Sequence, residues 1–264
     1  MIFIFSPTIF NHLEVIMKIA VCVSHVPDTA TRVKIAGDQK SIDPTGVSFV
    51  LNPYDEFAVE EALKTKEKFG GDVIVISVGG DQVKETIRKS LAMGVDEGVH
   101  LKTGEVLDSF AIAQALADEI KSLGCELVFM GKQSVDYDNG IVGQLTAEML
   151  GYNSISVCVT FQLEGTTVTA EREIEGGKEI VETSLPCVIT AQKGLNDPRY
   201  ASLKGIMTAK KKVIQEKPVG SKPALVENLQ LKMPVAKNPG RILGTDSSAV
   251  PELVKLLHEE AKVI

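Results

Sequence analysis

One stretch of the sequence, residues 126–151, constrains the fold most because its hydrophobic pattern changes period once. Residues 127–130 are uniformly apolar, as in one short buried strand. A polar loop follows, and apolar residues then recur at helical spacing from Ile141 to Leu150. The change of period predicts a strand, a polar loop and the start of a helix.

The polar loop of this unit is a candidate site for an anion. Asp138 or Asn139 is placed to cap the helix, with Gly140 in its first turn. A helix start presents free backbone N–H groups and the positive end of a dipole, which suit a phosphate group. The loop is also longer than the roughly 2–6 residues that such a connection needs. An ordinary connection without a ligand is the alternative interpretation.

The chain before this unit alternates between strand and helix patterns. Short apolar runs predict strands at residues 18–23, 33–36, 47–51, 72–78 and 99–101. Helical patterns run from residue 52, with Asn52 as the cap, to 69, from the Gly79-Gly80-Asp81 turn to Met93, and from 109 to 123. We therefore predict an α/β fold with a doubly wound, mostly parallel, Rossmann-like sheet.

The chain after Gly151 follows a different pattern. Residues 155–163, 167–174 and 179–185 alternate between polar and apolar, which predicts antiparallel strands. Weaker signals predict a strand at 187–190, a polar loop at 194–204, a helix at 205–212, an extended arm at 216–245 and a terminal helix at 252–262. The predicted domains are an α/β domain over residues 17–215 and a C-terminal arm with its helix over residues 216–264.

Composition narrows the classes of function. The formal net charge of -7 argues against nucleic acid as a partner, and an aromatic content of 5% argues against base stacking. The scattered histidines show no spacing typical of a metal site. The cysteines lie far apart, in or beside apolar runs, which indicates buried free thiols in a reducing compartment such as the cytoplasm.

The first residues of the chain have their own pattern. Residues 1–5 are apolar, but Ser6 and Pro7 interrupt the run before it reaches a membrane-spanning length. No Lys or Arg precedes the run, unlike in a signal peptide. We predict that Met17 is the native start, that residues 1–16 are a non-native or disordered extension, and that the chain does not insert into a membrane.

Three predicted loops follow the carboxyl ends of strands, at residues 24–29, 79–81 and 131–139. In an open α/β sheet these ends form the ligand crevice, and residues 52–55 are placed to line it. The sequence contains no G-x-G-x-x-G, G-x-x-x-x-G-K-[ST] or G-x-S-x-G motif. The pattern indicates a phosphate-containing ligand without a catalytic constellation, and a ligand-free scaffold is the alternative.

Residues 17–212 resemble the β subunit of the electron-transfer flavoproteins. The matching segments are NPYDEFAVEEAL (52–63), ETIRKSLAMG (85–94), GKQSVDYDNGIVGQLTAEML (131–150), EREIEGGKE (171–179) and LNDPRYASLKGIMTAKKK (195–212). The resemblance implies a heterodimer in which a larger α subunit holds most of the FAD, and the C-terminal arm is expected to pack on that subunit. It implies an electron carrier, not an enzyme, which moves electrons from acyl-CoA dehydrogenases of fatty acid oxidation toward a quinone oxidoreductase and the quinone pool.

The β subunits of this family also bury an AMP with a structural role. The commonest family pattern has Asn-Gln-Thr where this chain has Gly-Ile-Val, so side-chain contacts to the phosphate are lost while backbone N–H donors remain. The resemblance implies these AMP-binding positions: Cys22, Asn52, Pro53, Tyr54, Asp55, Val78, Gly131, Lys132, Gln133, Ser134, Val135, Asp136, Tyr137, Asp138, Asn139, Gly140, Ile141 and Val142.

The resemblance assigns roles to three further residues. Glu173 matches a position close to the flavin, and Thr29 falls roughly where another family residue approaches the flavin ring. Leu203 matches an exposed leucine that docks the carrier onto its dehydrogenase. From the residues alone, strand alternation favours an ordinary hairpin carboxylate at Glu173, and a core side chain is the alternative for Leu203.

Two other functions stay open. Electron-bifurcating members of the family bind a second FAD in place of AMP. Tyr137, Ile141 and Val142 take up the space that its ring needs, whereas Pro27-Asp28-Thr29 resembles the bifurcating type. A stand-alone adenine-nucleotide sensor on the same fold is the alternative from a different class.

Overall fold

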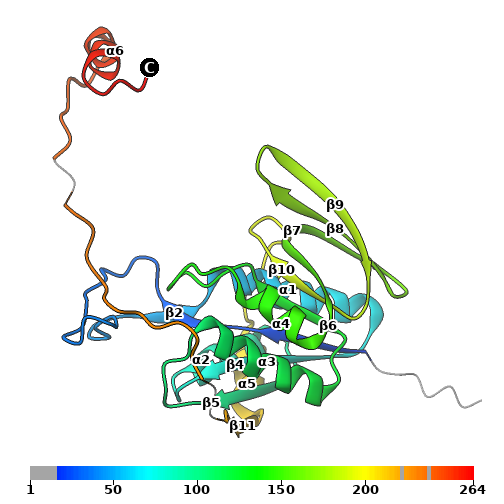
Figure 1. Cartoon of the computed structure of the whole chain (residues 1–264). Helices are drawn as coiled ribbons and strands as arrows, with labels where there is room; N and C mark the ends of the chain where they lie inside the picture. The colour runs from blue at the N-terminus through cyan, green and yellow to red at the C-terminus, as the bar shows by residue number, and fades with distance from the viewer. Residues whose placement is uncertain (1–16, 221–222, 237–238) are drawn as a thin grey trace, which may run out of the picture.

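A nine-stranded sheet organises the molecule, in the strand order β11-β5-β4-β1-β6-β10-β7-β8-β9 (Figure 1). The computed structural model describes residues 17–220, 223–236 and 239–264, so the predicted extension at residues 1–16 lies outside the described residues. The strands are β1 (Lys18–Cys22), β2 (His25–Pro27), β3 (Phe49–Leu51), β4 (Asp72–Gly79), β5 (Glu97–Lys102), β6 (Leu127–Gly131), β7 (Asn153–Glu164), β8 (Thr167–Ile174), β9 (Gly177–Ser184), β10 (Cys187–Ala191) and β11 (Ile214–Pro218). The helices are α1 (Pro53–Phe69), α2 (Val83–Met93), α3 (Ser109–Leu123), α4 (Val142–Leu150), α5 (Leu203–Lys211), the 3-10 turn η1 (Ser247–Ala249) and α6 (Val250–Glu259).

Helices cover both faces of the parallel part of this sheet. Ile19 and Val21 of β1 pack with α1 and α2, whereas the intervening Ala20 and Cys22 pack with α3 and α4. A strand that is buried on both faces needs apolar residues at successive positions, which explains the unbroken apolar runs of β1, β4 and β6. The predicted doubly wound α/β fold is confirmed.

The chain between β1 and α1 differs from its prediction. Residues 24–29, predicted as a loop, contain β2, which pairs with β3 in a separate antiparallel ribbon. Residues 33–36 form no strand, because only an isolated bridge joins Ile35 to Ile42. Both segments are too short for hydrophobic periodicity to separate strand from loop.

The strands after α4 are not all antiparallel as predicted. β10 pairs in parallel with β6, and the first half of β7 pairs in parallel with β10. Only the second half of β7 pairs antiparallel with β8, after a register shift near Val157, whose φ of 62° lies in the left-handed region. Alternating polarity reports that one face is exposed, but it does not report the direction of the neighbouring strand. The β8–β9 hairpin ends the sheet on this side and projects from the helix-covered body (Figure 1).

The start of the predicted arm belongs to the sheet. β11 pairs in parallel with β5 at the sheet edge and reaches Pro218, beyond the predicted boundary at residue 215. Its sequence, IQEKP, lacks an apolar run because an edge strand is exposed. The division of the chain into domains stays a prediction.

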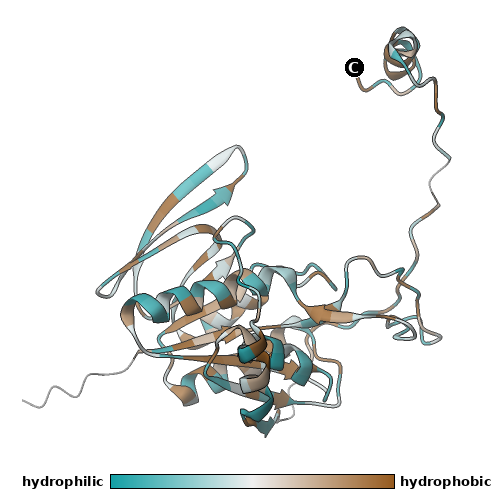
Figure 2. Cartoon of the chain, turned by 180° about the vertical axis from the view of Figure 1, so that it is seen from behind, coloured by the Kyte–Doolittle hydropathy of each residue, from teal (hydrophilic) through white to brown (hydrophobic). Residues whose placement is uncertain are grey.

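Residues 225–231 lie along the body, whereas α6 stands away from it (Figure 1). Asp108 Oδ2 accepts hydrogen bonds from the backbone N–H groups of Leu225 and Val226, at 2.7 and 2.9 Å. No residue of α6 is buried, and Figure 2 shows apolar and polar residues alternating around this helix. No helix in the described part of the chain is long and apolar enough to cross a membrane.

Candidate nucleotide site and docking surface

The strand order places a switch point between β1 and β6. From β1 the chain adds β4 and then β5 on one side, and it returns to add β6 on the other side. Connections from the carboxyl ends of β1 and β6 therefore leave in opposite directions, which opens a crevice in this class of fold. The loops that follow β1 and β6, predicted as site loops, both start at this switch point.

Asp55 joins the two strand ends across the switch point. It is the third residue of α1 and is 4% exposed. Its Oδ2 accepts a hydrogen bond from the Ser24 backbone N–H at 2.7 Å, and its Oδ1 accepts one from the Gly131 N–H at 3.0 Å. A Cβ atom at Gly131 would lie 2.2 Å from Asp55 Oδ1, so only glycine fits there. The floor of the crevice thus depends on one carboxylate and one glycine.

Burial shifts the pKa values of two groups at this place, the Asp55 carboxyl group and the Cys22 thiol. Desolvation raises the pKa of Asp55 to about 7, although its hydrogen bonds with Asn52, Ser24 and Gly131 act in the opposite direction. The pKa of the Cys22 thiol is raised, first by burial and then by the charge of Asp55. Cys22 is therefore a protonated, unreactive thiol that packs under the crevice.

Asn52 holds the loop after β6 in place. It occupies the cap position before α1, as predicted, but its side chain makes no cap hydrogen bond. Instead its Nδ2 donates to the Gln133 carbonyl at 2.9 Å, and its Oδ1 accepts from the Val135 N–H at 3.2 Å. Asn52 is fully buried, and its side chain supplies the partners that these loop backbone groups would have in a sheet.

The loop from Gly131 to Val142 is internally ordered. Ser134 Oγ donates to Asp136 Oδ1 at 2.6 Å, and the Asp138 N–H donates to the Ser134 carbonyl at 3.0 Å. Gln133 Nε2 donates to Asp138 Oδ1 at 2.7 Å. At the start of the loop, the Lys132 ammonium group lies 4.9 Å from the centre of the Tyr54 ring. The loop is a preformed turn with one cation at its base.

The predicted cap of the following helix is wrong. α4 begins at Val142, and Ile141, which has no side-chain oxygen, takes the cap position. Asp138 and Gly140 have φ values of 53° and 61°, so the chain turns there and does not enter a helix. Asn139 Nδ2 instead donates to Ser109 Oγ of α3, at 3.0 Å. Since no side chain caps α4, its first backbone N–H groups remain available to an anion.

The other predicted site residues fall into two groups. Pro53 and Tyr54 lie in the first turn of α1 at the crevice, and Val78 lies near the end of β4, the strand next to β1. Glu173 lies on β8, in the projecting hairpin, where its carboxylate accepts a hydrogen bond from Gln192 Nε2 at 2.8 Å. In the strand order β10 and β7 separate β8 from β6, so Glu173 belongs to a different part of the surface.

Leu203 lies on a helix and not in the predicted polar loop. It is the first residue of α5, and the Ser202 hydroxyl caps this helix by accepting a hydrogen bond from the Gly205 N–H at 3.0 Å. Its side chain is 84% exposed, which excludes the core position considered above. Its role in docking stays a prediction.

The fold also gathers a polar cluster that sequence spacing does not signal. Asp81, His100 and Glu216 come from the β4–α2 turn, β5 and β11. Lys84 pairs with Asp81 at 2.9 Å and with Glu216 at 2.7 Å, and Lys102 pairs with Asp81 at 2.8 Å. Hydrogen bonds from the two lysines lower the pKa of Asp81 to about 2. The two lysines neutralise the carboxylates, so the cluster is an ion-pair network that holds β11 at the sheet edge.

The strand order, with its switch point between β1 and β6, defines a doubly wound α/β protein. A family model for the electron transfer flavoprotein domain matches residues 40–221. The chain belongs to the electron transfer flavoprotein family, and the resemblance to its β subunits is confirmed.

Several relatives carry the name electron transfer flavoprotein subunit beta. The chain is 37% identical to that of Bacillus subtilis over 245 residues, which covers 89% of this chain and 95% of the relative. It is 37% identical to that of Bradyrhizobium diazoefficiens over 251 residues, covering 94% of this chain and all of the relative. The human protein is 37% identical over 253 residues, covering 94% of this chain and 99% of its own length.

Proposed function

We propose that the chain is the β subunit of a cytoplasmic, heterodimeric electron carrier whose larger α subunit holds most of the FAD. The heterodimer accepts electrons from acyl-CoA-type dehydrogenases and delivers them toward a quinone oxidoreductase. The observation that carries this proposal is the similarity to proteins named as β subunits over nearly their whole lengths. Redox activity requires the assembled heterodimer, because the flavin belongs mainly to the partner.

We further propose that the switch-point crevice holds AMP. The structure supports this through two features, the uncapped first turn of α4 and the Lys132 ammonium group. Backbone N–H groups at a helix start suit a phosphate without any side-chain contact, which fits the Gly-Ile-Val sequence at residues 140–142. The adenosine would lie across the floor formed by Asp55 and Gly131.

The partner subunit is proposed to cover the C-terminal end of the chain. Val250, Leu253 and Val254 of α6 are each about half exposed, at 51%, 44% and 48%. An amphipathic helix with no buried residue exposes its apolar stripe unless another surface covers it. The body already binds residues 225 and 226 through Asp108, so α6 extends from an anchored arm.

The test of the nucleotide assignment is to denature the purified heterodimer and to quantify the released nucleotides. One FAD and one AMP per heterodimer is the expected result. Two FAD and no AMP would instead identify a bifurcating type of subunit. A chain that purifies without a flavoprotein partner but with bound AMP would support the stand-alone sensor.

A further inference from the structure

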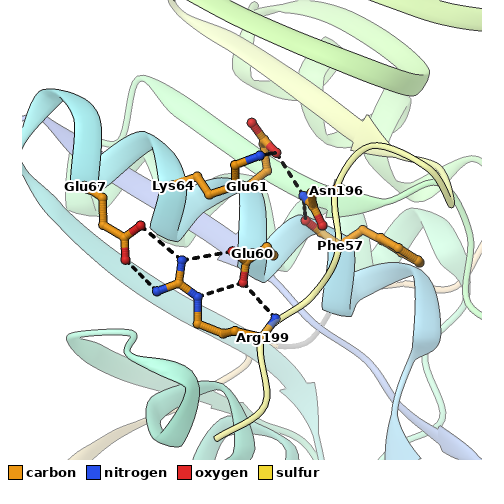
Figure 3. A network of polar contacts seen from close by, with 7 residues as sticks. All are labelled: Phe57, Glu60, Glu61, Lys64, Glu67, Asn196 and Arg199. Atoms are coloured by element: carbon orange, nitrogen blue, oxygen red, sulfur yellow. Dashed lines mark hydrogen bonds and ion pairs between the residues drawn. The ribbon is translucent and has the colours of Figure 1, made fainter.

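The segment between β10 and α5 is irregular in backbone but fixed to α1 (Figure 3). Leu195 anchors it in the core, with 9% of its surface exposed. Asn196 Nδ2 then donates to the Phe57 carbonyl at 3.0 Å and to Glu61 Oε2 at 2.9 Å. Polar contacts with the middle of α1 thus replace the packing that the segment lacks.

Arg199 makes the strongest of these contacts, which we call the Arg199 clamp (Arg199, Glu60 and Glu67). Its Nε and Nη2 donate to the two oxygens of Glu60, at 2.8 and 2.9 Å, and its backbone N–H donates to Glu60 Oε2 at 3.0 Å. Its Nη1 and Nη2 donate to Glu67 at 2.5 and 3.1 Å. Figure 3 shows the guanidinium group between the two carboxylates. A planar guanidinium with two bidentate partners fixes the orientation of the backbone that carries it.

The two carboxylates of the clamp differ in burial. The Glu60 side chain is 7% exposed, whereas the Glu67 side chain is 58% exposed. Arg199 lowers the pKa of Glu67, and the two carboxylates raise the pKa of Arg199. Glu60 therefore depends on Arg199 for charge compensation, and Glu67 can be removed without leaving a buried charge.

The far side of the segment is fixed as well. A Cβ atom at Gly205 would lie 2.3 Å from the Ala92 carbonyl oxygen, so α5 packs closely against the end of α2. Arg88 Nη1 donates to the Ala209 carbonyl at 2.5 Å and holds the last turn of α5. Between these two anchored regions, the side chains of Tyr200 and Leu203 are 98% and 84% exposed.

The exposed surface around Tyr200 has a consistent chemistry. Met207, one turn after Leu203 on α5, is 60% exposed. Lys204, Lys210 and Lys211 are exposed, and none of them forms an ion pair with a described residue. The chain as a whole carries a formal net charge of -7. The three lysines therefore make the surface of α5 positive on a chain that is negative overall. An apolar pocket rimmed by carboxylates on another protein is complementary to this surface.

We propose that the Arg199 clamp is a positioning device that holds Tyr200 outward, as a second anchor with Leu203, for an electron-donating protein with an acid-rimmed apolar pocket. This inference rests on the proposed function. A tyrosine that is held open in the free protein adds contact area at low entropic cost, because its backbone is already ordered. Arg199 and Glu67 act only through the position of Tyr200 and do not touch the partner's pocket.

The experiment measures reduction of the heterodimer's FAD by an acyl-CoA-type dehydrogenase, with the heterodimer as the varied substrate. The variants are Leu203→Ala, Tyr200→Ala, Tyr200→Phe, Arg199→Lys and Glu67→Ala. Lys89→Ala is the matched control, because it breaks the 2.5 Å ion pair with Glu56 between α1 and α2 and leaves the clamp intact. FAD content and the rate of reduction by dithionite show whether each heterodimer is intact independently of any protein partner.

Tyr200→Ala is expected to raise the apparent KM roughly tenfold or more with kcat unchanged, while Tyr200→Phe stays near wild type. Glu67→Ala and Arg199→Lys should raise KM by a smaller factor without loss of FAD. The double variant Tyr200→Ala/Glu67→Ala should then raise KM by a smaller factor than the product of the two single factors, since both substitutions act on the same anchor. Higher ionic strength should raise the wild-type KM, as expected for a lysine rim.

The outcomes separate this inference from the proposed function. If Leu203→Ala raises KM but Tyr200→Ala does not, docking stands and the second anchor is wrong. If Tyr200→Ala raises KM and the clamp variants match Lys89→Ala, the clamp is only structural. If none of the variants changes KM, this surface does not dock a dehydrogenase, and the docking role predicted for Leu203 is wrong together with the second anchor.

Discussion

Two irregular segments follow neighbouring strands, β6 and β10, and both are tied to α1, yet α1 holds them by opposite means. The loop after β6 is held at the start of α1 by Asn52 and Asp55, through hydrogen bonds to backbone groups. The segment after β10 is held at the middle and the last turn of α1 by the ion pairs of the Arg199 clamp. The first arrangement orders a loop that leads into the uncapped start of α4, whereas the second turns the side chains of Tyr200 and Leu203 out to solvent. One helix thus positions both a proposed small-molecule site and a proposed protein-docking site.

The largest expected effect concerns the contact that only a glycine allows. Gly131→Ala should destabilise the protein by about 3 kcal/mol, because the added Cβ would meet Asp55 Oδ1 and disrupt both of its hydrogen bonds. Urea unfolding of the purified heterodimer measures the loss. Gly177→Ala is the control, since nothing lies within 4 Å of a Cβ there. Equal stability of the two variants would mean that the floor of the crevice is not tightly packed.

The clamp should respond strongly to loss of its cation. Arg199→Ala leaves the Glu60 carboxylate buried without a partner and should cost about 2 kcal/mol, less than for a fully buried pair because Arg199 is partly exposed. Glu67→Ala should cost under ~1 kcal/mol, because the Glu67 side chain is mostly solvated. Thermal unfolding of the heterodimers ranks the two variants. A Glu67→Ala variant as unstable as Arg199→Ala would contradict this division of roles.

The two segments should also respond to pH in opposite directions. Burial raises the pKa of Asp55 to about 7 from an ordinary value of 3.8, so its contribution to stability is complete below about pH 4 and falls as pH rises toward 7. Hydrogen bonds from Arg199 lower the pKa of Glu67, so its contribution is present above its unfolded pKa and is lost in acid. Asp55→Asn should therefore cost more at pH 5.5 than at pH 8, by about 2 kcal/mol.

The cost of Glu67→Gln in unfolding free energy should change with pH in the opposite direction to that of Asp55→Asn. Its cost should be larger at pH 8 than near pH 3, since acid protonates the wild-type carboxylate and removes its ion pair with Arg199. Urea unfolding of wild type and both variants at each pH gives the two differences directly. If both costs changed in the same direction, at least one of the two carboxyl groups would titrate in a different environment from the one described.

Sequence patterns predict the central strands and the first helix better than the edge strand and the loops that connect these elements. Uniform apolar runs revealed β1, β4 and β6, and Asn52 with Pro53 marked the start of α1, because burial on both faces and helix starts leave local signals. β11 gave no such signal, since an edge strand needs no apolar run and its parallel partner lies far away in sequence. The loops of the crevice were found by their place after strands, not by any motif.

The details of both segments depend on contacts that no local pattern records. Asn52 looked like a helix cap, but its side chain bonds to loop residues 81 and 83 positions away. Arg199 meets Glu60 and Glu67 across 139 and 132 positions, and nothing in its own neighbourhood predicts either partner. The sequence pattern places Leu203 in a loop, whereas Ser202 caps α5 directly before it. Tertiary pairing, and not propensity, determines the contacts of Asn52 and Arg199.

The smallest predicted effect separates the two segments by their sensitivity to salt. The Arg199–Glu67 pair is exposed, so Glu67→Gln should cost about 0.5 kcal/mol in dilute buffer and close to zero in about 1 M NaCl, where the screening length is near 3 Å. Asn52→Ala removes fully buried hydrogen bonds, which dissolved salt screens much less than exposed ones, so its cost should stay the same at both salt concentrations. Each variant is compared with wild type in the same buffer by urea unfolding, which cancels the general effect of salt on apolar burial. A salt-dependent cost for Asn52→Ala would show that charge also holds the crevice loop, and the contrast between the two segments would then be lost.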